Sequence, residues 1–166
     1  MKFERKFEAK NNELFFVDGT PFPVAGCTAL TAASCRGKSA VPADVSRPFA
    51  VEVPWTAVGL DEEHYDEAFL ADFRDFLKAL EEKGGYAFVV PVADRLPSTD
   101  GEKENLTASF KHCARRIKDC VSVIGFAVPE CVDAVVFMDE LKAKHAQYVF
   151  FSRDEKLLSD GAVARF

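Results

Sequence analysis

The sequence predicts an α/β protein in which a parallel β-sheet follows an N-terminal β-hairpin. The clearest observation is the run Val121–Val128, which is almost entirely apolar, as expected of a parallel strand buried on both faces. Before it, apolar side chains recur three and four positions apart, which predicts an amphipathic helix over Leu106–Ile117. Similar helix and strand patterns alternate along the chain with short connections. This alternation favours right-handed βαβ units on one parallel sheet.

The first third of the chain predicts the hairpin and one strand. Glu13–Val17 and Phe22–Gly26 flank Asp18-Gly19, a dipeptide that favours hairpin turns. Residues 27–45 are mostly small and polar, so we expect a long connection with at most one short helix. Phe49–Pro54 then predicts the first strand of the parallel sheet.

The middle of the chain predicts a helix and a second strand. We expect the helix to begin at Leu60–Glu63, where acidic residues would meet the positive end of the helix dipole. Gly84-Gly85 is a helix-ending signal, and Tyr86–Val92 predicts a strand that ends beside Asp94. The apolar face of this helix consists of Phe69, Leu70, Phe73, Phe76, Leu77 and Leu80.

The next helix and strand lead to a candidate functional residue. Residues 95–104 are polar and predict a loop, so we expect the following helix to begin near Leu106. Pro129 has no N–H to donate to a sheet, and the strand Val121–Val128 is expected to stop there. Chemistry in α/β proteins gathers at the carboxyl ends of parallel strands, which is where Glu130 would lie.

One further helix–strand unit completes the prediction. A helix is expected over 132–145 and a strand over 148–151. The tail, 155–166, predicts a short helical turn followed by a final strand over 162–166.

Length and charge limit the classes of protein that fit. The 166 residues show no break in composition, so we expect a single domain over 1–166. A net charge of −6 argues against a nucleic-acid or membrane partner. No apolar run approaches the ~20 residues of a membrane span. The charged N-terminus lacks the apolar core of a signal peptide, which favours a cytoplasmic location, although a signal sequence removed beforehand would fit equally well.

Neither a metal nor a cofactor is expected. The histidines, His64, His112 and His145, have no companion at ligand spacing, and the five cysteines contain no C-x-x-C pair. The glycine-rich phosphate-binding motifs and the G-x-S-x-G motif are also absent from the sequence.

Several segments resemble motifs of family 5 glycoside hydrolases and their relatives of the same (β/α)8 clan. Those enzymes often begin with a hairpin of the form F-x-V-D-G-x-P-F-x-x-x-G, and residues 16–26 stand in that place. Val51–Pro54 is similar to their V-R-x-P strand, and Lys83–Val90 to their K-x-G helix end and the strand after it. Residues 114–126 are similar to their A-x-R-x-K-D-x-x-x-V-I-G-F segment.

The resemblance implies an incomplete TIM-barrel-like parallel sheet. A full barrel needs ~250 residues, whereas this chain would supply about the first five strands. A partial barrel leaves sheet edges that must be covered or paired. We therefore expect the sheet either to close differently or to form a homodimer through its open edge.

Departures from the family pattern bear on activity. Glu52 replaces the strand arginine, and inside an apolar strand it would need a basic partner such as Arg36 or Arg47. The Asn-Glu-Pro acid/base motif is reduced to Pro129-Glu130-Cys131. The resemblance places the nucleophilic glutamate on the seventh barrel strand, and a retaining glycosidase needs two carboxylates about 5 Å apart. These departures favour a protein without hydrolytic activity.

The predicted strand ends gather a small set of candidate site residues. The candidates are Asp94 and Glu130 as catalytic carboxylates, with Trp55, Glu52, Arg153 and Asp154 as substrate-binding residues. Trp55 either stacks on a sugar ring or packs against a loop. Asp94 and Glu130 either share acid/base work or each cap the helix that follows.

Three hypotheses for function follow. The first is a shortened glycoside hydrolase-like protein that lacks hydrolytic activity and binds carbohydrate at the strand ends. The second is an active glycosidase with Glu130 as general acid and a second carboxylate from Asp94, Glu52 or a partner subunit. The third is an interaction or oligomerisation module whose open sheet edge is the binding surface and which has no small-molecule site.

Overall fold

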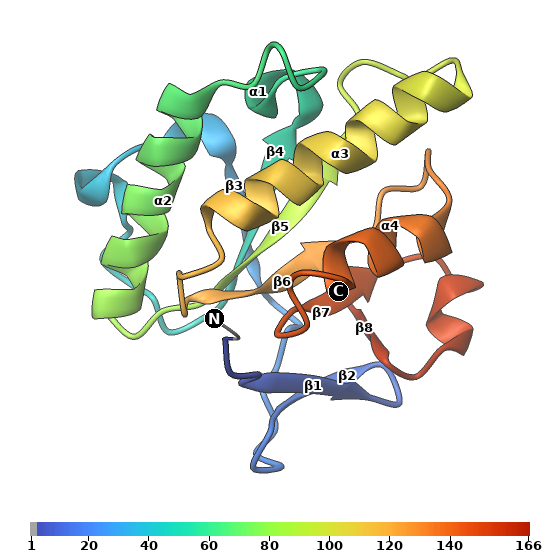
Figure 1. Cartoon of the computed structure of the whole chain (residues 1–166). Helices are drawn as coiled ribbons and strands as arrows, with labels where there is room; N and C mark the ends of the chain where they lie inside the picture. Colours follow the sequence, from blue (N-terminus) through green and yellow to red (C-terminus); the bar gives the residue numbers. More distant parts are fainter. Residues whose placement is uncertain (1–2) are drawn as a thin grey trace.

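A computed structural model of the chain describes residues 3–166 and contains a six-stranded parallel sheet together with a separate two-stranded hairpin (Figure 1). The order of the strands in the sheet is their order in the sequence, and every neighbouring pair is parallel. This arrangement confirms the prediction of a TIM-barrel-like parallel sheet after an N-terminal hairpin. The strands of the sheet are β3 (Thr28–Thr31), β4 (Phe49–Pro54), β5 (Ala87–Val92), β6 (Val123–Ala127), β7 (Val149–Ser152) and β8 (Val163–Arg165).

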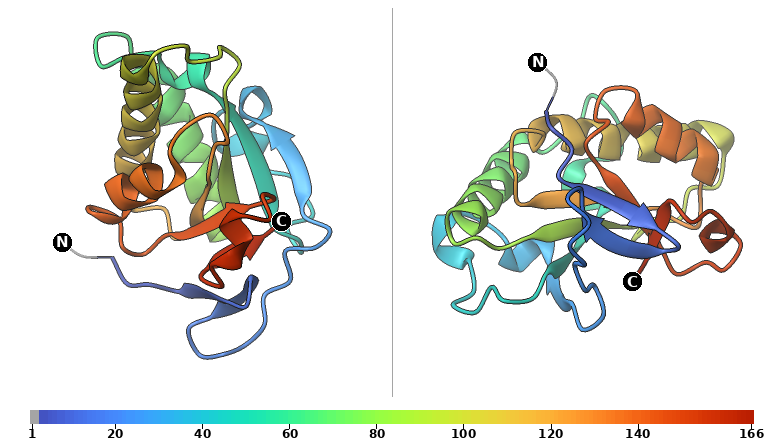
Figure 2. Two further views of the ribbon diagram at one scale, coloured as in Figure 1. Left: turned by 90° about the vertical axis from the view of Figure 1, so that its right-hand side faces the viewer. Right: turned by 90° about the horizontal axis from the view of Figure 1, so that it is seen from below.

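Helices cover one side of the sheet, and the hairpin lies below it (Figure 2). Within residues 3–166, no helix is both long enough and apolar enough to cross a membrane. The α-helices are α1 (Trp55–Val58), α2 (Glu67–Glu82), α3 (Asp100–Arg116) and α4 (Ala134–Lys142). Three short 3-10 turns, η1 (Ala32–Ser34), η2 (Lys38–Ala40) and η3 (Leu157–Ser159), lie in the connections.

The hairpin lies earlier in the chain than predicted. Its strands are β1 (Phe7–Lys10) and β2 (Glu13–Phe16), and the turn between them uses Asn11 and Asn12 with φ angles of 52° and 65°. Asparagine tolerates this left-handed conformation, as a tight hairpin turn requires. Asp18-Gly19 does form a turn, but only an isolated bridge from Phe15 to Pro21 follows it. Prolines have no N–H for a sheet, so a longer strand cannot form there.

Strand β3 was missed by the sequence analysis, which placed it in a long connection. It is short and mostly exposed, and it pairs with β4 alone. An edge strand of this kind lacks the apolar run that marks a buried parallel strand. The sheet therefore has six strands rather than about five.

Helix α2 begins later than predicted. Residues 60–63 are not helical, because the Asp61 side chain accepts hydrogen bonds from the main-chain N–H of Glu63 and from the His64 ring. Such local bonds compete with helix formation. The helix instead begins after Asp66, whose carboxylate accepts a hydrogen bond from Phe69 N at 2.9 Å.

The end of α2 lies where the glycine pair predicts it. Gly84 adopts a φ of 74°, which favours glycine, and its N–H donates to Glu81 O. The N–H of Gly85 donates to Leu80 O at 3.0 Å. These two bonds form a Schellman motif that satisfies carbonyl groups at the helix end.

Helix α3 begins before the predicted position, inside the segment expected to be a loop. Thr99 accepts a hydrogen bond from Glu102 N at 3.1 Å, and the Glu102 carboxylate accepts one from Ser98 N at 2.8 Å. This reciprocal arrangement is close to a capping box, whose T-x-x-E signal is present in the sequence. Capping therefore explains why polar residues belong to the helix.

The C-terminal part follows the prediction closely. Asp133 caps α4 by accepting from Val136 N, and the helix is shorter at both ends than the predicted range 132–145. Strand β7, the turn η3 and strand β8 all lie within a few residues of their expected positions.

The two faces of the sheet contribute to two different cores. Alternate residues pack under the helices, and the residues between them pack towards the hairpin. On the hairpin side, the rings of Phe88 and Phe151 stack with centroids 4.2 Å apart. The hairpin adds a cluster of edge-to-face aromatic contacts made by Phe7, Phe16, Phe22 and Tyr86.

The hairpin turn also covers one edge of the sheet. Arg165 N in β8 donates to Asn12 O at 2.9 Å, and the Asn12 side chain donates to Val163 O at 2.8 Å. The other edge, β3, has no strand neighbour on its outer side among residues 3–166. The sheet thus remains open at β3, while β8 is bonded to the hairpin.

Candidate functional site

A cavity of about 380 Å³ lies at the carboxyl ends of β5, β6 and β7, and we call it the rim cavity. Carboxyl ends of parallel strands are the usual location of binding sites in α/β proteins. The lining residues are Val90, Pro91, Val92, Ala93, Ala127, Val128, Pro129, Glu130, Cys131, Ser152, Arg153 and Phe166.

Glu130 lies in the rim cavity with its side chain exposed. It follows strand β6, which is fully buried. Val128, the first residue after that strand, donates its main-chain N–H to Phe151 O at 2.9 Å. Within residues 3–166, the Glu130 carboxylate forms neither a hydrogen bond nor an ion pair with another side chain or main-chain group. The turn that follows β6 therefore presents a carboxylate that is free to meet a ligand.

Arg153 reaches the rim cavity from the end of β7. Its guanidinium carbon lies 4.2 Å from the centroid of the Phe166 ring, and its Nε donates to Phe166 O at 3.1 Å. The Phe166 ring in turn packs edge-on against Phe88, with centroids 5.3 Å apart. These contacts hold the guanidinium group in place by stacking and hydrogen bonding.

Asp94 is not part of the rim cavity. Its carboxylate accepts hydrogen bonds from the main-chain N–H of Thr56, at 3.1 Å, and from the Thr56 hydroxyl. Thr56 lies in the first turn of α1, so Asp94 caps that short helix from a distant part of the chain. The capping interpretation is therefore the one that applies, although the capped helix is α1 rather than the helix that follows Asp94.

Trp55 is buried, with 2% of its surface exposed. Its Nε1 donates to Ser109 Oγ in α3 at 3.1 Å. The turn of α1 at the end of β4 directs the indole under α3, so neither face of the ring is open to a sugar. The structure thus places Trp55 inside the molecule rather than at the rim, and its packing partner is a helix rather than a loop.

Glu52 lies on the sheet face opposite the helices, where it pairs in register with Thr31 and Val90. It is exposed, and no basic side chain within residues 3–166 forms an ion pair with it. Arg36 pairs with Asp72 at 2.8 Å, and Arg47 reaches the main-chain oxygen of Gly26. Solvent instead stabilises the Glu52 charge.

Asp154 serves the chain turn after β7. Its carboxylate accepts from Lys156 N at 3.0 Å, and its main-chain oxygen accepts from Leu158 N at 2.9 Å. It does not line the rim cavity. Of the six candidate residues, the structure brings only Glu130 and Arg153 together in one cavity.

Two lining residues were missed by the sequence analysis. Cys131 follows Glu130 directly, and burial raises the pKa of its thiol, so the group is not poised as a nucleophile. Phe166 lies beyond β8, and its contact with Arg153 depends on the register that places Ser152 opposite Arg165. No local sequence signal reports such a register.

Within residues 3–166, no three His, Cys, Asp or Glu side chains converge on a common metal position.

No protein-family model matches the chain, and no curated protein matches it either. Solved structures do resemble its fold. The crystal structure of an endogalactoceramidase superposes with a TM-score of 0.65 at 10% identity, covering 98% of this chain and 59% of that enzyme. The catalytic domain of the endoglucanase Cel5A of Thermobifida fusca, in complex with cellotetraose, gives a TM-score of 0.60 at 14% identity. The superposition covers 88% of this chain and 52% of that domain.

A second structure of that endoglucanase domain gives a TM-score of 0.58 at 13% identity. The chain spans just over half of the length of these enzymes. Identities this low establish the fold alone. The chain therefore shares the family 5-like fold of clan A glycoside hydrolases over six consecutive parallel strands.

Proposed function

We propose that this glycosidase-like chain binds a carbohydrate at the rim cavity without hydrolysing it. The observation that carries the proposal is the content of the cavity, in which Glu130 is the one lining side-chain carboxylate among residues 3–166 and stands with Arg153. Asp94, the expected second carboxylate, is bonded to Thr56 outside the cavity.

Hydrolysis of a glycosidic bond needs two carboxyl groups on opposite sides of the bond. They are about 5 Å apart in retaining enzymes and about 6.5–9.5 Å apart in inverting ones. In the part of the chain that the structure describes, the side chains that line the rim cavity supply a general acid candidate and no second carboxylate. Binding needs less: hydrogen-bonding groups that fix the hydroxyls and an apolar surface for the C–H groups.

Both requirements of binding are met in the rim cavity. The Glu130 carboxylate accepts hydrogen bonds, and the Arg153 guanidinium donates them. Val90, Ala127 and Phe166 give the cavity apolar walls. The choice of carbohydrate as the ligand class draws on the likeness in fold to the endoglucanase solved with cellotetraose.

The test is a titration with cellotetraose and with a galactose-containing oligosaccharide, followed by main-chain amide NMR signals. We expect saturable shifts around Glu130 and Arg153, and Arg153→Ala should weaken binding about tenfold by removing charge-assisted hydrogen bonds. Arg95→Ala is the matched control, because Arg95 is also exposed near the strand ends but does not line the cavity. Flat titrations, or equal weakening by the control, would contradict carbohydrate binding at this cavity.

An active glycosidase is the second candidate, and the position of Glu52 favours it. This exposed carboxylate lies next to Val90, which lines the rim cavity. Wild-type protein would then turn over aryl glycosides, and Glu130→Gln would abolish the turnover while the circular dichroism spectrum stays unchanged. The first proposal expects turnover no faster than in buffer. Activity that depends on Glu130 would therefore replace it.

A homodimer through the open edge remains a prediction, and the unpaired outer side of β3 favours it. Edge strands of this kind can pair with a second chain. Sedimentation over a range of concentrations should show association that Thr28→Lys weakens, since Thr28 is exposed on that strand. A monomer at every concentration would remove the homodimer.

A further inference from the structure

A second cavity, of about 600 Å³, lies beside α3 and is bordered by the segment that follows α4 and by the loop that precedes α2; we call it the α3–α4 hollow. It shares no residue with the rim cavity. Its lining residues are Phe3, Glu62, Tyr65, Ala108, Lys111, His112, Arg115, Lys118, Lys144 and His145.

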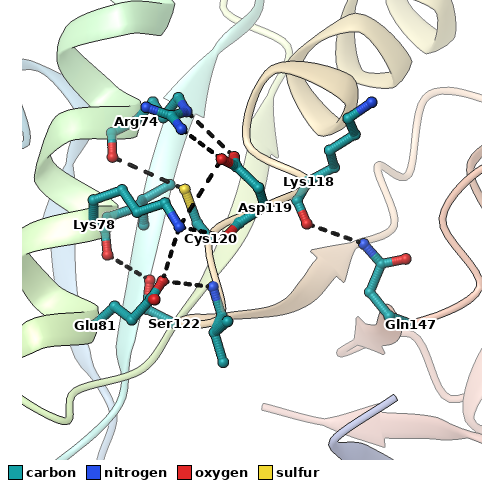
Figure 3. A network of polar contacts seen from close by, with 10 residues as sticks. Arg74, Lys78, Glu81, Lys118, Asp119, Cys120, Ser122 and Gln147 are labelled. Atoms are coloured by element: carbon teal, nitrogen blue, oxygen red, sulfur yellow. Dashed lines mark hydrogen bonds and ion pairs between the residues drawn. The ribbon is translucent and has the colours of Figure 1, made fainter. Parts of the chain in front are cut away.

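Positive charge is concentrated in this hollow, although the chain carries a net charge of −6. Arg115, Lys118 and Lys144 are exposed and form no ion pair with any residue between 3 and 166. The side chain of Lys118 extends away from the neighbouring network around Asp119 (Figure 3). Lys111 is paired with Glu140 at 2.7 Å.

Uncompensated cations that face one cavity create a local positive potential. Among the described residues that line the hollow, Glu62 is the one acidic side chain. Their combined charge therefore favours an anion.

A buried histidine gives an independent sign of a missing ligand. His145 is 3% exposed and lines the hollow, and its Nδ1 has no hydrogen-bond partner in the part of the chain that the structure describes. Buried polar atoms are almost always satisfied, so an orphan of this kind points to an absent partner. Burial and the ammonium groups of Lys118 and Lys111 lower the pKa of His145, so the ring is neutral at neutral pH and retains one N–H donor.

Complementing the helix dipole explains only part of this arrangement. Cations near helix C-termini are favourable in their own right, which accounts for Arg115 in the last turn of α3. The helix dipole does not account for the buried Nδ1 of His145, which lacks a hydrogen-bond partner among the described residues. The stacked rings of Tyr65 and His112, with centroids 4.3 Å apart, also line the hollow, whose volume of about 600 Å³ gives room for a group larger than inorganic phosphate.

We infer that the α3–α4 hollow binds a small, multiply charged anion of the phosphate class. Arg115, Lys118 and Lys144 neutralise the anion, and the orphaned imidazole of His145 contacts it from the inner side. Phosphate oxygens accept strong hydrogen bonds from such charged donors. The site is independent of the rim cavity and of carbohydrate binding there.

The test is an NMR titration of the protein with inorganic pyrophosphate at constant ionic strength, observing the imidazole signals of His145. We expect a saturable shift, and the double variant Lys118→Ala/Lys144→Ala should weaken binding about tenfold by removing two charge-assisted contacts. Both lysines are exposed, so the variant should fold normally. A phosphorylated sugar tested in parallel shows whether the wall beside Tyr65 accepts an attached ring.

The matched control is Lys6→Ala/Lys156→Ala, which removes the same charge at exposed positions outside the hollow. This control should bind pyrophosphate within about twofold of wild type, because distant exposed charges are screened. If both double variants weakened pyrophosphate binding equally, the loss would reflect overall charge alone, and the proposed site would be overturned. Signals of His145 that do not move at roughly 10 mM pyrophosphate, a concentration above any useful affinity, would overturn it as well.

Discussion

The indole Nε1 of Trp55 donates a hydrogen bond to Oγ of Ser109 across 3.1 Å. The bond joins the end of β4 to the middle of α3, between residues 54 positions apart in the sequence. The Ser109 hydroxyl shares its one hydrogen between Gly59 O, at 2.7 Å in the loop that follows α1, and Asn105 O, at 2.8 Å. One buried hydroxyl thus satisfies two groups at the point where the strand end, α1 and α3 meet.

Ser109→Ala should lower the free energy of unfolding by about 1–3 kcal/mol, because the buried Trp55 N–H loses its acceptor and the Gly59 carbonyl loses a donor. Urea denaturation followed by the fluorescence of Trp55, the one tryptophan of the chain, measures this change directly. Ser159→Ala is the control, since its hydroxyl bonds to Lys156 O at an exposed position. If the two variants were equally stable, the buried hydrogen bond would have no role in stability.

Gly125→Ala should destabilise the sheet by about 3 kcal/mol or more, since no room exists for a methyl group. A Cβ at this position would lie 1.7 Å from Val149 O and 2.8 Å from Val149 N, which are main-chain atoms of the neighbouring strand β7. Thermal unfolding followed by circular dichroism provides the measurement.

A second glycine makes the matched comparison for that variant. Gly101 lies in the first turn of α3, and a Cβ there would approach nothing closer than Thr99 Oγ1 at 3.9 Å. Gly101→Ala should keep or raise stability, by up to about 1 kcal/mol, because alanine is the better helix former. A Gly125→Ala variant as stable as Gly101→Ala would show that β6 and β7 do not approach as closely as the structure has them.

Asp119→Asn should remove a pH-dependent contribution to stability. The Arg74 guanidinium hydrogen-bonds the Asp119 carboxylate at 3.2 and 2.5 Å and lowers its pKa below the ordinary 3.8 (Figure 3). A group whose pKa is lower in the folded state stabilises the fold above its unfolded pKa, and this contribution is lost as the pH falls through the folded pKa. Both side chains are more than one third exposed, so the effect at neutral pH should stay below about 1 kcal/mol.

Free energies of unfolding of wild type and Asp119→Asn, measured between about pH 7 and about pH 3, test this sign. The difference between the two proteins should be largest at neutral pH and should shrink in acid. Asp75→Asn serves as the control, since it removes the same charge beside Arg74 in α2 and leaves the hydrogen bonds between Arg74 and Asp119 in place. A difference that grows in acid would contradict the lowered pKa of Asp119.

The sequence predicted the elements whose signals are local. The apolar runs of β5, β6 and β7 and the glycine pair after α2 lie where periodicity and turn chemistry placed them. Strand β3 escaped because its short, exposed edge carries no such run, and the early start of α3 escaped because its T-x-x-E signal was read as part of a loop.

The candidate site was predictable only in part, because several of its contacts join residues that lie far apart in the sequence. Glu130 could be placed because it directly follows a strongly apolar strand. The partners of Asp94 and Arg153 lie elsewhere in the chain, and the register of the sheet decides them. A side chain at a strand end can turn towards a cavity or towards a neighbouring helix, and local sequence does not distinguish these outcomes.

Periodicity in the sequence determined by itself that strands and helices alternate, that the strands run parallel and that a carboxylate follows β6, because these features arise from contacts within one element or its flanks. Only the tertiary structure decided that Trp55 is buried against Ser109, that Asp94 caps α1 and that His145 lies beneath a cluster of cations. Those outcomes depend on how elements that are distant in the sequence pack against each other. In a close-packed interior each side chain has one position, and local sequence alone cannot specify it.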